Sequence, residues 1–360
     1  MSRVLHAIGA APSVTVRAPG KVNLSLRVGP RGDDGFHPLV TVFQAVSLSE
    51  EVSVTEGAPG SGITLSVSGD GALAVPRDET NLAWRAALAI HERAHGCGHR
   101  QPGSGHGGPG PGGARDHVAR EQRRGPLSVV TDPVPSASQG LPDVAIHLRK
   151  GVPVAGGMAG GSADAAATLV ACNALLGAGL DDEALHELAA GLGSDVPFSL
   201  LGGTAVGTGR GDLLSPVMAR GTYHWAFATF LRGLPTPEVF RRFDEMNPSG
   251  PAGGWVPSLA DEDAPLLAAL RTADAPALGE ALRNDLQPAV LALRPDLSRT
   301  LDIARDAGAL GAIVSGAGPT VAALASSPNA AERIAAKWRL HDAADRTLVA
   351  SAPAPGARIL

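Results

Sequence analysis

The sequence lacks the features that mark secreted and membrane proteins. Its two cysteines, Cys97 and Cys172, are too few for a disulfide framework and belong to no CxxC pair, which favours a reducing compartment. No run of about 18 apolar residues, the length of a membrane span, is present, and the first residues contain no apolar core suited to a signal peptide. We therefore expect a cytoplasmic protein that does not associate with a membrane.

The sequence also lacks an excess of charge of one sign. Its formal net charge is −5 at pH 7, which gives no reason to expect a nucleic acid or an anionic membrane surface as partner. At 360 residues and 44% hydrophobic content, the chain can bury two ordinary cores. We expect two domains, with the boundary in the turn-rich segment 209–221.

The common nucleotide-binding motifs are absent as well. GxxxxGK[ST] is not matched, because no lysine follows the glycines, and neither is GxGxxG with an acidic residue about twenty positions later. A different glycine-rich segment is present, PVAGGMAGGSADAAAT at 153–168, in which four glycines precede a strong helix-forming run. Exposed N–H groups at the start of a helix attract anions, so this segment predicts a phosphate site, with Ser162 as N-cap or first-turn residue. A packed turn without a ligand is the alternative.

Two shorter glycine segments lie far from this one in the sequence. SGAGPT at 315–320 separates two predicted strands, and it either approaches a ligand or a neighbouring loop or serves only as a hairpin turn. APGKVN at 18–23 places Lys21 near the start, where a lone lysine would ordinarily be a solvated surface side chain.

Hydrophobic periodicity predicts a mixture of helices and strands. Strands are expected at 13–26 (two short strands around a turn at APGK), 40–48, 51–55, 63–67, 143–148, 224–230, 309–314, 321–325 and 346–350. Helices are expected at 81–95, 162–177, 182–191, 237–246, 298–307 and 330–340, with further helix within 264–293. Residues 96–142 are rich in Gly and Pro and predict a disordered insertion. The irregular spacing of its histidines (His99, His106 and His117, with His91 and His95 nearby) argues against a metal site.

The three glycine segments together are more specific than each alone. PGKVNLSL at 19–26, PVAGGMAGGSADAA at 153–166 and SGAGPT at 315–320 occur in the order of the three motifs of the GHMP kinase superfamily, which the chain resembles. Within it, the chain is similar to the kinases that act on 4-diphosphocytidyl-2-C-methyl-D-erythritol. The segments that carry this similarity are GFH at 35–37, GSDVPF at 193–198, LPTP at 234–237 with Phe240, and NDLQP at 284–288. The resemblance spans nearly the whole chain apart from 96–142 and the first dozen residues.

The resemblance implies an α+β, two-domain GHMP kinase fold. Residues 1–217 would form the nucleotide domain, similar to domain 2 of ribosomal protein S5, and residues 218–360 a ferredoxin-like α/β sandwich. The implied activity is ATP-dependent phosphorylation of the 2-hydroxyl of the cytidine-diphosphate-linked methylerythritol, in the non-mevalonate route to isoprenoid precursors. The implied partner is this small molecule, with no nucleic acid and no membrane, and the protein would be a monomer or a weak homodimer.

The resemblance also implies roles for individual residues. Lys21 and Asp195 would be catalytic, with Asp195 as the base, although from the residues alone Asp195 could equally be a helix cap or turn residue. The residues implied in nucleotide binding are Asn81, near the adenine, and Pro153, Val154, Ala155, Gly156, Gly157, Met158, Ala159, Gly160, Gly161, Ser162 and Ala163 in the loop. Those implied in substrate binding are Asn23, Phe36, His37, Asp195, Thr236, Phe240 and Gly316. Phe36 would stack on the cytosine and His37 would read its polar edge, with core packing as the alternative for Phe36 and Phe240.

The loop departs from the usual family pattern at two places. Met158-Ala159 replaces Leu-Gly, and Ala163 replaces a frequent second serine, which removes one hydroxyl that could touch phosphate or metal. Mg²⁺ is expected, with Ser162 as a possible ligand and its other protein ligands left open.

Two alternatives remain at this point. A homoserine or mevalonate kinase would share the three-motif plan, but the GFH and NDLQP segments argue against both. A catalytically silent ligand-binding member of the fold would have no need for Lys21 and Asp195.

Overall fold

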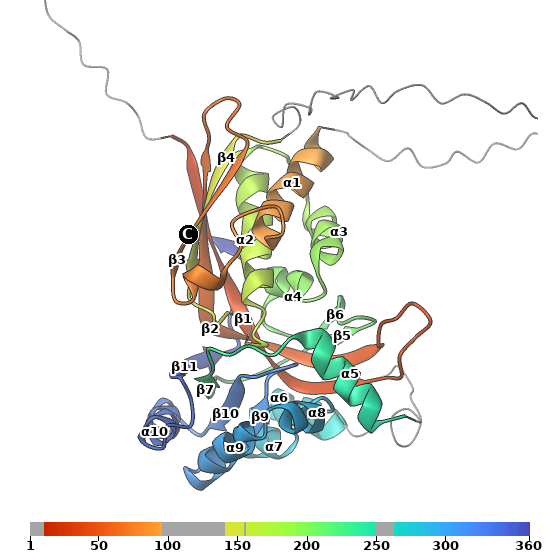
Figure 1. The fold of residues 1–360 in the computed structure, drawn as a ribbon, viewed down its shortest axis with the longest axis vertical. Helices are drawn as coiled ribbons and strands as arrows, with labels where there is room; N and C mark the ends of the chain where they lie inside the picture. Colours follow the sequence, from red (N-terminus) through yellow and green to blue (C-terminus); the bar gives the residue numbers. More distant parts are fainter. Residues whose placement is uncertain (1–10, 96–140, 155, 249–262) are drawn as a thin grey trace, which may run out of the picture.

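Two β-sheets, each covered by helices, make up the part of the chain that the computed structural model describes, residues 11–95, 141–154, 156–248 and 263–360 (Figure 1). The first sheet contains β1 (Ser13–Val28), β2 (Leu39–Glu56), β3 (Ile63–Gly69), β4 (Val144–Lys150), β5 (Thr204–Thr208), β6 (Leu213–Pro216), β8 (Arg283–Asn284) and β12 (Arg358–Ile359). The second sheet, in the antiparallel order β11-β7-β10-β9, contains β7 (Tyr223–Thr229), β9 (Gly311–Val314), β10 (Val321–Ala325) and β11 (Arg346–Ala352). The α+β class expected from the sequence is confirmed.

The helices are divided between the two sheets. They are α1 (Leu82–Ala94), α2 (Gly160–Leu175), α3 (Asp182–Leu192), α4 (Val196–Leu201), α5 (Thr236–Met246), α6 (Ala264–Thr272), α7 (Ala275–Glu280), α8 (Gln287–Leu293), α9 (Asp296–Asp306) and α10 (Pro328–Leu340), with a 3₁₀ turn at Ala72–Ala74. In Figure 1, α1, α2 and α3 lie on one face of the first sheet, and α7 to α10 gather around the second. No helix in the described ranges is long and apolar enough to cross a membrane.

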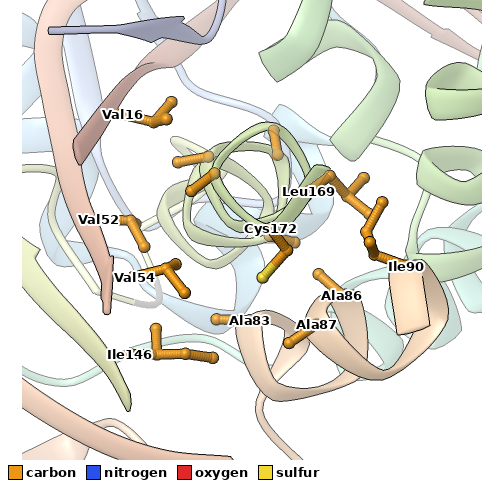
Figure 2. Close-up of a cluster of buried hydrophobic side chains, with 14 of the residues drawn as sticks. Val16, Val52, Val54, Ala83, Ala86, Ala87, Ile90, Ile146, Leu169 and Cys172 are labelled. Carbon is orange, nitrogen blue, oxygen red and sulfur yellow. The ribbon is translucent and has the colours of Figure 1, made fainter. Parts of the chain in front are cut away.

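Helix α2 is the centre of the first core. It lies between the strands and α1, so that Val52 and Val54 of β2 face it from one side and Ile90 of α1 from the other (Figure 2). Five alanines of α2 are fully buried (Ala163, Ala165, Ala166, Ala167 and Ala171), and their small side chains let the helix approach the sheet closely. Cys172 is packed here as an apolar side chain, and burial raises the pKa of its thiol to about 12.

The second sheet is buried on both faces. Along β7, Trp225 and Phe227 point into a core shared with β1 and β2, while Ala226 and Ala228 point into a core shared with α5, α8, α9 and α10. This alternation follows from the two-residue period of a strand. The two sheets therefore share a continuous interior.

The long hairpin of β1 and β2 differs from the expected short strands. The prediction of two strands around a turn at APGK was wrong, because β1 continues through it and only its register shifts, between Pro19 and Gly20 and again between Asn23 and Ser25. The expected strands 40–48 and 51–55 are likewise one strand, β2. Bulges of this kind bend a strand without ending it, so a bent strand and two strands give the same alternating pattern.

Segments from the second half of the chain complete the first sheet. Strands β8 and β12 both pair with the edge of β1 that faces away from β2, β8 in parallel at Ser25 and Leu26 and β12, at the C-terminal end, antiparallel at Val16 and Arg17. The tail that leads to β12 is hydrogen-bonded to α4 and its neighbours, with Ala357 N–H donating to the Ser199 carbonyl and Gly203 N–H to the Ala354 carbonyl. The division at residues 217 and 218 remains our proposal for the domain boundary, with these two strands crossing it.

Part of the sequence analysis concerns residues outside the described ranges. Residues 96–140 of the expected insertion, with Cys97, His99, His106 and His117, lie there, as does Ala155 of the glycine loop.

Gly356 should be intolerant of any side chain. A Cβ at this position would overlap the main-chain carbonyl of Leu200 in α4. We expect Gly356→Ala to lower the free energy of unfolding by about 1–3 kcal/mol, as overpacking does, when measured by denaturant unfolding. The control is Gly191→Ala in α3, where a Cβ meets nothing within 4 Å and where alanine should stabilise the helix by about 0.5–1 kcal/mol. Equal stability of the two variants would contradict the packing of the tail on α4.

Candidate active site

The three glycine segments of the sequence meet at one place. Lys21 N–H donates to the Met158 carbonyl over 3.1 Å, and the Ser315 hydroxyl donates to the Gly157 carbonyl over 3.1 Å. Gly157 has φ +76°, and a Cβ there would fall on the Ser315 carbonyl oxygen. Glycine is therefore required by both the backbone conformation and the contact. The SGAGPT segment is at once the β9–β10 hairpin turn and a wall of the central glycine loop.

Asn284 anchors the SGAGPT segment from behind. Its side-chain N–H groups donate to the carbonyls of Val314 and Gly316, each over 2.8 Å, and its oxygen accepts from Leu286 N–H. Gln287 accepts from Val314 N–H over 2.9 Å. In the sequence, NDLQP served only as a family marker, and the structure shows that its side chains hold this turn in place.

Lys21 is buried where the three segments meet. Its Nζ donates to Asn23 Oδ1 over 2.6 Å and lies 3.8 Å from Asp195 Oδ2. Only 4% of the residue is exposed, and burial lowers the pKa of its ammonium group, an effect that Asp195 opposes. Asn23 in turn donates to Thr41 Oγ1 over 2.8 Å. Asn23 thus orients Lys21, and both its side-chain groups are bonded within the protein.

Asp195 occupies the N-cap position of α4, but its side chain makes no hydrogen bond to the helix. The side chain of Asp195 is therefore not used to cap α4, and about a third of it (32%) is exposed. A carboxylate beside a buried ammonium group, yet open to an incoming molecule, can accept a proton from a bound hydroxyl.

The central glycine loop opens onto the N-terminus of α2. The helix begins at Gly160 with Ala159 as N-cap, so Ser162 is a first-turn residue and not the cap. Ala159 takes φ +60°, a conformation that glycine, usual in the family at this position, adopts without strain. The first N–H groups of a helix lack intrahelical partners, and no acidic residue occupies this turn. The fully buried Thr320 hydroxyl, which has no hydrogen-bond partner, lies against Gly156. These donors and the cradle of glycines fit a phosphate group.

A small hollow of about 250 Å³ adjoins this loop. Asn81 lines it and caps α1, accepting from Ala83 N–H over 2.8 Å and donating to the Pro76 carbonyl over 2.7 Å. Val154 and Gly161 of the loop also line it, with Lys150 and Asp164.

Lys150 belongs to a buried charge cluster that the sequence analysis missed. Its Nζ lies 2.5 Å from Asp164 Oδ2 and 2.6 Å from Glu50 Oε1, and Gly151 N–H donates to Glu50 Oε2 over 2.9 Å. The cluster joins β2, the end of β4 and α2. Because Glu50 and Lys150 are one hundred positions apart, no local pattern reveals their contact. One signal was present: the chain has only three lysines, and one of them lies shortly before the loop.

The cluster holds more negative than positive groups. Burial raises the pKa of Glu50 to about 7, with the charge of Asp164 adding to the shift and Lys150 opposing it. Burial likewise raises the pKa of Asp164 against the effect of Lys150. Burial alone would lower the pKa of Lys150, but the two carboxyl groups outweigh it and raise that pKa. Below about pH 7, the two carboxyl groups therefore hold a proton between them while Lys150 stays charged.

A larger hollow of about 720 Å³ gathers most of the remaining predicted residues. Its lining includes Phe36, His37, Thr236 and Phe240, and also Gly193 and Ser194, which directly precede Asp195. Phe36 is 51% exposed, so the core-packing alternative is excluded for it. Phe240 is half-buried and packs against the second core as well.

His37 is used differently from the expectation. Its Nδ1–H donates to the Gly29 carbonyl over 2.8 Å, its Nε2 lies 3.4 Å from Asp244 Oδ1, and its ring stacks on Phe240 with centroids 5.0 Å apart. Both ring nitrogens thus face protein groups. The ring supports Phe240 and does not present a free polar edge to the hollow.

Comparisons with known proteins agree with these motifs. Two family models match the chain, "GHMP kinases N terminal domain" over residues 129–203 and "GHMP kinases C terminal" over residues 266–343. A relative from Thermobifida fusca (strain YX), 4-diphosphocytidyl-2-C-methyl-D-erythritol kinase, is 47% identical over 98% of this chain and 100% of its own length. A crystal structure of 4-(cytidine 5'-diphospho)-2C-methyl-D-erythritol kinase is 28% identical, with a TM-score of 0.65 over 94% of this chain and 99% of that one. Homoserine kinase from Cytophaga hutchinsonii has a TM-score of 0.64 over the full length of both chains at 18% identity, which shows a shared fold alone.

The charge cluster predicts a pH dependence of stability. Between the ordinary pKa of 4.5 and the raised value of about 7, the native Glu50 keeps a proton that the unfolded chain has lost. Folding then takes up a proton, so the free energy of unfolding falls as pH rises through this window, by at most about 1.4 kcal/mol per pH unit for one proton. We expect Glu50→Gln to make this decline shallower in denaturant unfolding between pH 4.5 and 7.5. Glu183→Gln, at an exposed position of α3, is the control, and a decline as steep in Glu50→Gln as in the unchanged protein would show that the proton is held elsewhere.

Proposed function

Because this chain belongs to the GHMP kinases, and within them to the 4-diphosphocytidyl-2-C-methyl-D-erythritol kinases, we propose that its site transfers the γ-phosphoryl group of ATP to the 2-hydroxyl of 4-diphosphocytidyl-2-C-methyl-D-erythritol. The observation that carries the proposal is the Lys21–Asp195 pair. Lys21 is hydrogen-bonded to the central glycine loop, and Asp195 comes directly after Gly193 and Ser194, which line the large hollow. The reaction belongs to the non-mevalonate route to isoprenoid precursors.

Phosphoryl transfer needs positioning and charge stabilisation more than covalent chemistry. The N–H groups of the glycine loop and of the first turn of α2, with the Thr320 and Ser162 hydroxyls, would hold the phosphates of ATP. The small hollow beside Asn81 would receive its adenine. The large hollow would receive the cytidine part of the acceptor, with its base on the exposed ring of Phe36 and with Thr236 and Phe240 forming the opposite wall.

Proton removal is assigned to Asp195. As the acceptor's 2-hydroxyl attacks phosphorus, its proton would pass to the Asp195 carboxylate, and the nearby Lys21 ammonium would stabilise the negative charge that develops on the oxygen. Burial of Lys21 strengthens this effect, because little water screens its charge. The hydrogen bond to Asn23 keeps the Lys21 ammonium group in place beside Asp195.

Magnesium fits this site only if the phosphates of ATP and waters supply most of its ligands. The described residues offer no group of three or more His, Cys, Asp or Glu side chains that could hold a metal. Mg²⁺ is commonly bound through phosphates, waters and one or two protein oxygens, which the half-buried Ser162 hydroxyl can supply. When bound, it would neutralise phosphate charge. We further propose a cytoplasmic location, from the cysteine content, and a monomer or weak homodimer.

An ATP-consumption assay over four acceptors tests the proposal: 4-diphosphocytidyl-2-C-methyl-D-erythritol, homoserine, mevalonate and galactose. We expect turnover with the first alone. Turnover with homoserine or mevalonate would reassign the substrate within the fold, and no turnover with any acceptor would favour a ligand-binding protein without activity.

Replacing the base should separate turnover from binding. We expect Asp195→Asn to lower kcat at least about a hundredfold, because the amide cannot accept the proton, while the affinities for ATP and acceptor stay within several-fold. Steady-state kinetics with isothermal titration of both ligands measures the two effects. Asp182→Asn, at an exposed position of α3, should behave as the unchanged enzyme. If Asp195→Asn kept its turnover, the proton would have to leave by another route.

A further inference from the structure

An exposed aromatic ring in the large hollow is covered on one face by an arginine. Phe36 is the only aromatic residue among the exposed large hydrophobic side chains of the described chain. The guanidinium carbon of Arg210, in the turn between β5 and β6, lies 3.8 Å from the centroid of the Phe36 ring. Only the other face of the ring is then open to a planar ligand.

One carboxylate holds both members of this stack. Asp34 Oδ1 accepts from Phe36 N–H over 3.0 Å, while Asp34 Oδ2 accepts from Arg210 over 3.3 Å. Neighbouring contacts hold the turn itself, since Arg210 N–H donates to Asp212 Oδ1 over 3.1 Å and Leu39 N–H to the Gly209 carbonyl over 2.7 Å. Two segments about 170 residues apart in sequence, 31–37 and 209–212, therefore form one side of the hollow.

This arrangement fixes the orientation of a phenylalanine ring that would otherwise be mobile in water. A ring with half its surface in water can turn about its side-chain bonds, and a ligand that stacks on it must first stop that motion. A guanidinium group stacks on aromatic faces and can at the same time bind a carboxylate. Arg210 thus keeps the ring in position before the ligand arrives.

We propose that Arg210, held by Asp34, is a positioning residue that sets the affinity of the Phe36 surface for the nucleobase of the acceptor. This inference rests on the proposed function, which places that base on Phe36. Arg210 then acts through Phe36, without contact to the ligand's phosphates, and it influences neither ATP binding nor the chemical step.

A double-mutant cycle tests this assignment. We expect Arg210→Met, which keeps a long side chain but removes the guanidinium group, to raise KM for the cytidyl acceptor about five- to tenfold, with kcat and KM for ATP changed less than twofold. In a Phe36→Leu background, the same replacement should change KM less than twofold, because the ring that it positions is gone. Asp34→Asn should shift KM in the same direction by a smaller factor.

The control uses a similar ion pair elsewhere. Arg93 and Glu187 are also exposed and 3.3 Å apart, and neither lines the large or the small hollow described above. Arg93→Met should leave all three constants unchanged, and circular dichroism should show that each variant is folded.

Two results would overturn the proposal. An unchanged KM in Arg210→Met would show that the stack has no influence on binding, and a full effect that persists in Phe36→Leu would show that Arg210 contacts the ligand directly. Neither result affects the proposed function, which fails only if the unchanged enzyme does not phosphorylate the acceptor.

Discussion

The close approach of two main chains, at Gly157 and Ser315, is the constraint on which the site depends. No side chain can stand between them, so the central loop and the SGAGPT turn touch directly, and Lys21 reaches the same point through its N–H contact with Met158. Segments that begin near residues 20, 155 and 315 thus form one surface. Asn284, in β8 of the first sheet, and Gln287, at the start of α8, hold the SGAGPT turn between β9 and β10 of the second sheet, so both sheets contribute to the single site.

Electrostatic preorganisation follows from where the few lysines lie. Two of the three in the chain, Lys21 and Lys150, are buried, and each faces carboxylate groups. The two pairings have different consequences. Lys150 is enclosed by two carboxyl groups and joins the end of β4 to β2 and α2, whereas Lys21 is bonded mainly to a neutral amide and keeps its charge available to a ligand beside Asp195. Lys150 therefore has a structural role next to the glycine loop, and Lys21 is placed to act on a ligand that the loop binds.

The sequence predicted the parts of this site that depend on local pattern. The glycine loop followed by a helix, and the roles of Lys21 and Asp195 implied by the resemblance, correspond to residues that the structure brings together. Long-range contacts were not predictable: Glu50 falls between two predicted strands, and Arg210 within a turn-rich boundary, and the partners of both are far away in sequence. The bulge at APGK was predicted as a turn because a bend leaves the alternation of a strand intact. The contacts of the two His37 ring nitrogens, with the Gly29 carbonyl and the Asp244 carboxylate, were missed because no sequence motif connects these residues.

Phosphorus NMR of the reaction products tests the central claim most directly, that a buried lysine beside Asp195 serves to phosphorylate one particular hydroxyl. With ATP, Mg²⁺ and 4-diphosphocytidyl-2-C-methyl-D-erythritol, the account predicts one new phosphomonoester signal per ADP formed, on the tertiary 2-hydroxyl, with the diphosphate of the acceptor intact. ADP formed without a phosphomonoester, or a phosphate on another hydroxyl, would contradict it.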